Sequence, residues 1–338
     1  DHRYLHSFPT RRSSDLTGAH FLALSNGRAV GRICVSDDPA CNEMHRENVG
    51  CFGMFECVDD QRVANKLLHV AGRWLAQRGR ELIRGPIDYS LNYPCGLLID
   101  GFDTPPRVMM NHQPPYYQRL LETAGLAKAK DLYAWWYNDV EALAAMAPRF
   151  ERLAERFRVK VRCLDLRNFA AEMNRCRKIY NSAWEEAWQS APFSNAEFEA
   201  LAKNLQRVSR PDFTLLAEVD GEPVGLVMLI PDVNEAAAPL NGRLTTWGLP
   251  LGLARLLYRL PRVQTARLAV LGVERGFRRR GVAELLILQV MRNAVRRGSI
   301  RQAELSWTLE DNPLVNALIE RTGGHRYKTY RIYQRGLN

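Results

Sequence analysis

The stretch GVERGFRRRGVAELL, Gly272–Leu286, decides the fold because it joins a strand pattern to a helix pattern through a glycine. The apolar run Leu268–Val273 predicts a buried strand, and apolar residues after Gly281 recur with helical spacing. A helix that begins near Gly281 leaves its first N–H groups without partners and has its positive dipole end there. We therefore expect an anion site, in which Gly281 admits the ligand and the arginines add charge. A solvated arginine cluster is the other interpretation.

The same order of elements occurs twice along the chain. Phe21–Val35 and Phe213–Ile230 both read as hairpins, with the turn pairs Asn26-Gly27 and Asp220-Gly221. In each half a strand, an amphipathic helix, a strand, a short helix and a last strand follow. This order predicts an α/β fold of two tandem units, each a mixed, mostly antiparallel twisted sheet flanked by helices.

The predicted organisation has four parts. Residues 17–140 form the first unit, 141–158 a helical connector and 159–338 the second unit. Residues 1–16 contain HSFPTRRSSDL, which looks like a translated sequencing adapter or a disordered segment. We exclude them from the fold and expect the native N-terminus to be missing; a transit peptide is the alternative.

Composition indicates a globular protein, with 46% hydrophobic and 25% charged residues among 338. No apolar run approaches the roughly 20 residues that a membrane span needs. The seven cysteines are scattered without paired metal-ligand spacing, which favours reduced thiols in a cytoplasmic protein and no metal site.

The positive charge lies in the C-terminal part. From Leu251 to the end, 17 Lys and Arg stand against 6 Asp and Glu, a balance of +11. Since the whole chain carries +10, the preceding 250 residues sum to −1. This distribution favours one anionic ligand site over a surface coated for nucleic acid.

The spacing Arg278-x-x-Gly281-x-Ala283 after a strand resembles the Arg/Gln-x-x-Gly-x-Gly/Ala loop of the GCN5-related N-acetyltransferase (GNAT) superfamily. The resemblance covers about residues 159–335 and, in a degenerate form, residues 21–137. The chain as a whole is similar to a bacterial group with two tandem GNAT-type domains. It implies that the loop amides bind the pyrophosphate of acetyl-CoA or a longer acyl-CoA, and that the preceding strand pairs with the pantetheine arm. The contacts that it implies are Leu271, Gly272, Val273, Arg278, Arg279, Arg280, Gly281, Val282, Ala283, Asn312 and Asn316.

The first half differs at this loop. Counting back from the glycine that ends each helix puts Asp59 opposite Arg278 and Arg62 opposite Gly281. An acid and a bulky side chain would then replace the phosphate-site arginine and glycine. We expect the first half to keep the fold without binding CoA.

The resemblance implies direct attack of a primary amine on the acyl thioester, the reaction of an N-acetyltransferase. The backbone N–H of Val273 would polarise the carbonyl. Glu310 is the candidate base, with an exposed loop acid as the other interpretation. The tyrosine that often protonates the thiolate in this family is Ile319 here, so Tyr330 or Tyr327 is the candidate acid. Strand alternation places these two tyrosines on opposite faces, so only one could serve.

The acceptor side is marked by a long connection. About thirty residues follow Ile230 before the next strand, and such loops are usually functional. The apolar segment 249–260 is expected to cover a pocket or line one for an acyl chain; a plain lid is the alternative. Candidate acceptor contacts are Asn234, Glu235, Arg243, Asn92 and Tyr116.

The expected acceptor is an amine on an amino acid, a small metabolite or a protein. A catalytically inactive CoA-binding sensor and a basic nucleic-acid-binding protein are the alternative functions. Nucleic acid is disfavoured as a partner because the arginines cluster at one helix start and the aromatic residues form no base-stacking pattern. The sequence does not predict an oligomeric state.

Overall fold

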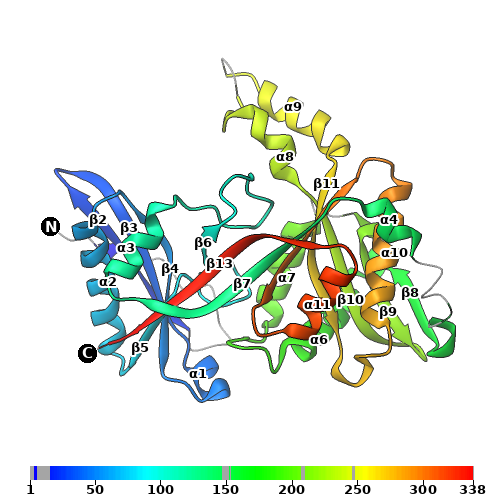
Figure 1. The fold of residues 1–338 in the computed structure, drawn as a ribbon, viewed down its shortest axis with the longest axis horizontal. Helices are drawn as coiled ribbons and strands as arrows, with labels where there is room; N and C mark the ends of the chain where they lie inside the picture. Colours follow the sequence, from blue (N-terminus) through cyan, green and yellow to red (C-terminus); the bar gives the residue numbers. More distant parts are fainter. Residues whose placement is uncertain are drawn as a thin grey trace.

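The computed structural model describes residues 4–5, 16–146, 152, 154–206, 210–245 and 248–337. Within these ranges, thirteen strands form one mixed sheet that runs through the whole molecule (Figure 1). The strand order is β1-β2-β3-β4-β5-β13-β7-β12-β11-β10-β9-β8, and β6 pairs with β13. The predicted fold class is therefore confirmed.

The first half supplies the strands at one end of the sheet. Its strands are β1 (Tyr4–Leu5), β2 (Thr17–Ser25), β3 (Arg28–Asp37), β4 (Val49–Cys57), β5 (Leu82–Gly85), β6 (Leu97–Asp100) and β7 (Ala127–Tyr137). Its helices are α1 (Pro39–His45), α2 (Gln61–Ala76) and α3 (Tyr116–Thr123). β1 lies in the segment that the sequence analysis set aside, most of which is outside the described residues.

The second half repeats the order. Its strands are β8 (Val159–Cys163), β9 (Thr214–Val219), β10 (Glu222–Pro231), β11 (Thr265–Val273), β12 (Gln302–Leu309) and β13 (His325–Gly336). Its helices are α6 (Phe169–Trp184), α7 (Asn195–Gln206), α8 (Val233–Ala237), α9 (Leu251–Arg259), α10 (Val282–Arg296) and α11 (Pro313–Arg321). Short 3-10 turns are η1 (Leu166–Asn168), η2 (Pro211–Phe213), η3 (Ala238–Leu240), η4 (Leu260–Arg262) and η5 (Arg275–Phe277).

Local signals placed several elements correctly. Both hairpin turns have positive φ angles, 50° and 77° at Asn26-Gly27 and 51° and 86° at Asp220-Gly221, which is the conformation that these residue pairs favour. A capping box forms at the start of α7: the Glu197 amide donates to Ser194 Oγ at 3.3 Å, and the Ser194 amide donates to the Glu197 carboxylate at 3.2 Å.

The two halves exchange their last strands. β7 of the first half lies between β12 and β13, and β13 of the second half pairs with β5 and β6 (Figure 1). The predicted boundaries between the two units stay a prediction. The sheet itself is continuous, because strands from both halves are hydrogen-bonded to one another. Of the connector helix predicted over 141–158, α4 (Val140–Ala145) covers the start, and a large part lies outside the described residues.

Helices cover both faces of the second-half sheet. α10 packs on one face, in a core that includes Leu286 and Val290, and α6 with α7 packs on the other, around Ile179 and Phe198. α2 and α3 form the corresponding core of the first half. All seven cysteines are free thiols. No helix in the described ranges is both long and apolar enough to cross a membrane.

Candidate active site

Two neighbouring strands of the second half diverge. β11 and β12 run parallel and pair only at Thr265–Arg267 with Gln302–Glu304. Beyond that point β11 stays paired with β10 up to Val273, while β12 pairs with β7. The edge of β11 that faces β12 therefore has no partner, among the described strands, over the residues where the pantetheine arm was expected.

The arginine loop follows the end of β11. Seven residues, 274–280, separate Val273 from Gly281, which is the N-cap of α10 with φ 75° and no side-chain cap. Arg279 also has a left-handed φ of 64°. Because no side chain caps α10, the amides of its first turn are available to an external acceptor. The predicted helix start is confirmed, and a helix N-terminus of this kind suits an anion.

The three arginines of the loop do not act alike. Arg278 Nη2 donates to the Ala183 carbonyl at 2.6 Å and its Nε to the Val273 carbonyl at 3.4 Å, so this side chain ties the loop to the end of α6. Arg279 and Arg280 are exposed, and the Arg280 guanidinium lies over the Phe277 ring. Neither guanidinium has an ion pair among the residues that the structure describes, so both leave positive charge beside the helix start.

Gly272 is required for a contact that the sequence analysis missed. A Cβ atom at this position would lie 2.6 Å from the Trp184 ring and 3.1 Å from Ala183. Trp184 in turn stacks on Tyr180 at 4.3 Å between ring centroids. The end of α6 therefore packs directly against β11 beside the loop. No local signal links residues this far apart in the sequence.

Asn312 and Asn316 lie at the start of α11. Pro313 is the first residue of this helix, and the Asn312 side chain makes no capping hydrogen bond. Asn316 Nδ2 donates to the Leu309 carbonyl at 3.1 Å, and its Oδ1 accepts from Thr308 at 2.5 Å. Asn316 thus joins β12 to α11, and contact of either residue with CoA remains a prediction.

The first half has the same strand divergence without the loop. β4 and β5 pair only at Val49–Cys51 with Leu82–Arg84. Only two residues separate β4 from Asp60, the N-cap of α2, and the Asp60 carboxylate accepts from the Arg62 amide at 2.8 Å. The helix start is thus capped by its own acid, which supports the prediction that this half does not bind CoA. The alignment of Arg62 with Gly281 is wrong by two residues, because Asp60 and Gly281 hold the equivalent N-cap positions.

The predicted base and acid are both engaged in contacts. Glu310 Oε2 accepts from Lys128 Nζ at 2.5 Å, and its Oε1 accepts from the Asp131 amide at 3.0 Å. The Tyr330 hydroxyl is buried and donates to the Asn111 carbonyl at 3.1 Å. Contacts with first-half residues therefore hold both side chains in place.

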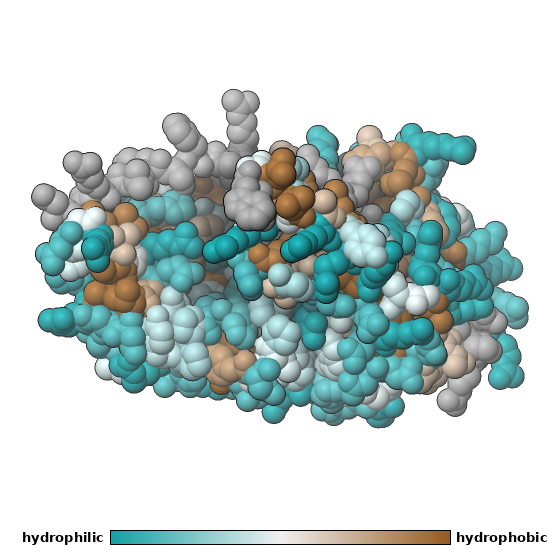
Figure 2. Space-filling view, turned by 90° about the horizontal axis from the view of Figure 1, so that it is seen from above, coloured by the Kyte–Doolittle hydropathy of each residue, from teal (hydrophilic) through white to brown (hydrophobic). Residues whose placement is uncertain are grey.

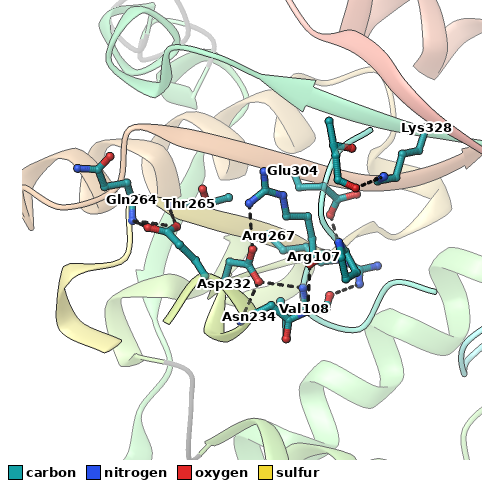
Figure 3. Close-up of polar contacts among 12 residues, drawn as sticks. Arg107, Val108, Asp232, Asn234, Gln264, Thr265, Arg267, Glu304 and Lys328 are labelled. Atoms are coloured by element: carbon teal, nitrogen blue, oxygen red, sulfur yellow. Dashed lines mark hydrogen bonds and ion pairs between the residues drawn. The ribbon is translucent and has the colours of Figure 1, made fainter. Parts of the chain in front are cut away.

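A buried carboxylate at the point of divergence was missed by the sequence analysis. Glu304 belongs to the last pair before β11 and β12 separate, and its side chain is fully buried (Figure 3). Arg267 Nε lies 3.1 Å from Glu304 Oε2, but neither carboxylate oxygen has a well-formed hydrogen bond among the described residues. Burial raises the pKa of Glu304, while the Arg267 charge and the nearby Ser306 amide oppose the rise.

Arg267 and Glu304 face away from α10. Their strand neighbours Ala266 and Ala303 belong to the core under α10, so alternation directs the charged pair to the opposite face of the sheet. In β12, Glu304 shares its side of the strand with Gln302, Ser306 and Thr308, so the sequence pattern alone does not mark it as buried.

Tyr327 lies near Glu304 and has a buried hydroxyl without a hydrogen-bond partner among the described residues. Burial raises its pKa, and the Glu304 charge adds to the rise, so the hydroxyl stays protonated. The prediction that Tyr327 and Tyr330 face opposite ways is wrong. The pairing of β13 with β7 skips Tyr327, and this bulge shifts the alternation, so both rings pack on the same core, which includes Leu132.

A loop of the first half packs against this buried group (Figure 3). Asp232 is buried; its Oδ1 accepts from the Val108 amide at 2.9 Å, and its Oδ2 from Arg107 Nη1 at 3.2 Å. Arg267 Nη1 donates to the Val108 carbonyl at 2.6 Å. Lys328 is buried and donates to the carbonyls of Gly101 and Thr104, and burial lowers its pKa to about 8. A first-half segment thus packs against the second half at these residues.

The predicted acceptor contacts do not form one group. Asn234 Nδ2 donates to the Pro106 carbonyl at 3.1 Å, in the same first-half loop. Glu235 accepts from the amides of Gln264 and Thr265. Arg243 is exposed on the connection between α8 and α9.

The two first-half candidates lie elsewhere. Asn92 Nδ2 donates to the Ala191 carbonyl at 2.7 Å, and its Oδ1 accepts from the Tyr180 hydroxyl at 3.0 Å, so it joins the two halves. Tyr116 packs in the first-half core and donates to the Cys57 carbonyl at 2.8 Å. These contacts are with the protein itself and give Tyr116 no path to the diverging strands.

The described residues hold no group of three or more His, Cys, Asp and Glu side chains that could bind a metal ion. The arrangement instead combines three features. They are a helix start that suits an anion, a strand edge without a partner among the described strands, and a buried carboxylate near a buried phenol.

Comparisons with known proteins identify a family model and two related chains. The model of the acetyltransferase (GNAT) family matches residues 173–324. The chain is 38% identical over 324 residues to Protein YghO of Escherichia coli K12, covering 94% of this chain and 82% of that protein. It is 36% identical over 323 residues to a bacterial ceramide synthase of Caulobacter vibrioides, covering 94% and 83%.

Among solved structures, a tandem GNAT protein from the clavulanic acid biosynthesis pathway has a similar fold. It superposes with a TM-score of 0.54 at 12% identity, covering 96% of this chain and 84% of that one. At this identity the likeness concerns the fold alone.

Proposed function

The chain belongs to the acetyltransferase (GNAT) family, and on that basis we propose that it is an N-acyltransferase that moves an acyl group from acyl-CoA to a primary amine. The divergence of β11 and β12 directly before an uncapped, glycine-led helix carries the proposal. The strand edge from Leu271 to Val273 would hold the pantetheine arm, and the start of α10 the pyrophosphate.

The charged groups divide this binding task. The backbone amides from Gly281 to Ala283 would receive the phosphate oxygens, and Arg279 and Arg280 would add positive charge from the surface. Arg278 would support CoA binding indirectly, because its guanidinium donates to the Ala183 carbonyl and so holds the loop in place. The amide of Val273 or Gly272 would polarise the thioester carbonyl.

For proton transfer we propose Glu304 in place of Glu310, since both Glu310 oxygens already accept hydrogen bonds. The amine nitrogen attacks the thioester carbon, a C–N bond forms and the C–S bond breaks. The amine gives its proton to Glu304, directly or through a water, and the thiolate takes a proton from Tyr327. The products are an amide and free CoA thiol, and a proton passes from Glu304 back to Tyr327.

We propose that the acyl group is a long chain or the acceptor a lipid amine. The support is the relative named bacterial ceramide synthase, since a ceramide is an N-acylated long-chain amine. In the experiments below, acetyl-CoA is the short-chain donor with which a long-chain acyl-CoA is compared.

Two measurements test the proposal in sequence. Thermal unfolding is followed with acetyl-CoA and with palmitoyl-CoA below its micellar concentration; a ligand at 100 times its Kd adds about 2.7 kcal/mol. Thiol release is then measured with a panel of amines that includes a long-chain amino alcohol. No thermal shift with either donor contradicts CoA binding, whereas a shift without thiol release from any amine favours the catalytically inactive CoA-binding sensor.

Glu304→Gln separates binding from chemistry. This variant keeps the volume of the side chain and removes the proton acceptor, so the thermal shift with acyl-CoA should persist while kcat falls by roughly 100-fold or more. Glu310→Gln is the matched control and should retain most of the activity. The opposite ranking would assign the base to Glu310.

A further inference from the structure

The connection between β10 and β11 forms an extension that stands away from the sheet. It runs from α8 through α9 to η4 and rises above the diverging strands in Figure 1. It leaves the sheet beside Thr265, where β11 is still paired with β12. The arginine loop lies at the other end of β11.

Exposed apolar side chains gather on this extension. Thirteen large apolar residues are exposed in the described part of the chain, and six of them lie within residues 244–258. These six are Leu244, Leu249, Leu251, Leu253, Leu257 and Tyr258. Figure 2 looks down on this side of the molecule and shows brown residues near its middle, with hydrophilic residues around them. A cluster of this kind on one short segment indicates an interaction surface.

The fold uses only one stripe of α9. Gly252 is buried, and Leu256 and Leu260 pack against the core of the second half. Leu257 and Tyr258 point elsewhere and are 61% and 65% exposed. The interpretation of α9 as the lining of an enclosed acyl pocket is therefore not supported, because its remaining leucines face solvent.

Beyond Glu235 of α8, the charged residues of the extension are all basic. Residues 236–273 contain no Asp or Glu, whereas Arg243, Arg255, Arg259 and Arg262 are all exposed there. Arg255 and Arg259 are one helical turn apart and lie on the same side of α9. The Arg262 guanidinium lies 3.9 Å from the centre of the Tyr258 ring. Arginines thus border the apolar surface.

We infer that this extension docks on the surface of an anionic lipid bilayer. A short helix with leucines and a tyrosine on most of its circumference, bordered only by arginines, can bury its apolar side chains at the level of the lipid headgroups. The arginines reach the phosphates while their alkyl stems stay in contact with the apolar layer. The absence of acids over 38 consecutive residues, 236–273, removes the repulsion that such a surface would otherwise meet.

Docking would orient the molecule. The extension lies beside the end of β11 where Glu304 and Arg267 form the last pair before the divergence. A membrane-bound amine or acyl chain would therefore reach the diverging strands without crossing bulk water. The inference depends on exposure and charge alone and would stand if the proposed N-acyl transfer failed.

Vesicle co-sedimentation tests it with the full chain. Vesicles of phosphatidylcholine with 30 mol% phosphatidylglycerol are compared with pure phosphatidylcholine, a composition chosen from the chemistry of anionic leaflets. We expect binding to the anionic vesicles that weakens at high salt. Replacing Arg255 and Arg259 by Gln should weaken it about 25-fold, since each basic residue near the surface contributes about fivefold.

The apolar part is tested with the double variant Leu253→Ser and Leu257→Ser. These side chains are exposed, so the fold should survive, and vesicle affinity should fall more than tenfold. Leu24→Ser, an exposed leucine at the β2–β3 turn, is the matched control and should bind as the unaltered chain does. Unchanged binding of the double variant, or no binding of the unaltered chain, overturns the inference. If the double variant instead converts a dimer to a monomer in light scattering while the vesicle signal is unaffected, the surface belongs to a second copy.

Discussion

Alanine substitution at the two ends of α10 separates CoA binding from folding. Gly281 and Gly298 flank the same helix, and both have left-handed backbones, with φ 75° and 81°. A Cβ atom at Gly298 meets nothing within 4 Å, so a substitution there adds backbone strain without a clash. Gly281→Ala and Gly298→Ala should each lower the free energy of unfolding by about 1–2 kcal/mol.

Only Gly281→Ala should also weaken CoA. Its Cβ would stand where the phosphate approaches the first-turn amides, and loss of one hydrogen bond to a charged group costs about 1.5–3 kcal/mol. The dissociation constant of CoA should therefore rise roughly 10–100-fold in Gly281→Ala and stay unchanged in Gly298→Ala. Isothermal titration with CoA gives the affinity, and urea unfolding gives the stability. Equal CoA affinity in both variants would refute the phosphate site at Gly281.

Three further predictions concern the packing and the protons of the site. Gly272→Ala should destabilise the protein by about 1–3 kcal/mol, because Trp184 must move. With Trp184→Ala in the same chain, the total loss of stability should be smaller than the sum of the two single losses; additive losses would contradict the contact. Burial raises the pKa of Glu304, and a base must be ionised to act. The kcat should therefore rise with pH, with an apparent pKa above the usual glutamate range. A kcat that does not change above pH 5 argues against Glu304. Asp232→Ala should lower the free energy of unfolding by about 3–5 kcal/mol in chemical denaturation, because it leaves the largely buried Arg107 without this ion pair. Adding Arg107→Met to this variant should restore part of the lost stability.

The sequence predicted several features that depend on neighbours along the chain. The Asn26-Gly27 and Asp220-Gly221 turns and the helix start at Gly281 formed as expected. Each rests on a backbone conformation or a hydrogen bond that spans only a few residues. The repeat of the same order in both halves followed from these local signals.

The catalytic candidates show the limit of that reasoning. Glu310 and Tyr330 were selected from their positions along the strand pattern, and both make hydrogen bonds with residues of the first half. Glu304 was not among the candidates, and the side of the sheet expected for Tyr327 was wrong because the bulge in β13 alters the alternation. A bulge changes which face a side chain takes, and local propensity does not reveal it.

By itself, the sequence determined the elements and their order in each half. Only the tertiary structure decided which half of the sheet each last strand joins. β7 and β13 follow the same sequence pattern, so either half could accept either strand. The decision depends on contacts between distant residues, such as Trp135 Nε1 donating to Thr308 Oγ1 at 2.8 Å and Arg331 pairing with Asp131 at 2.7 Å. The same long-range packing brings the loop around Arg107 to Asp232 and so encloses Glu304. These energies exist only once the two halves meet, and no window of the sequence contains them.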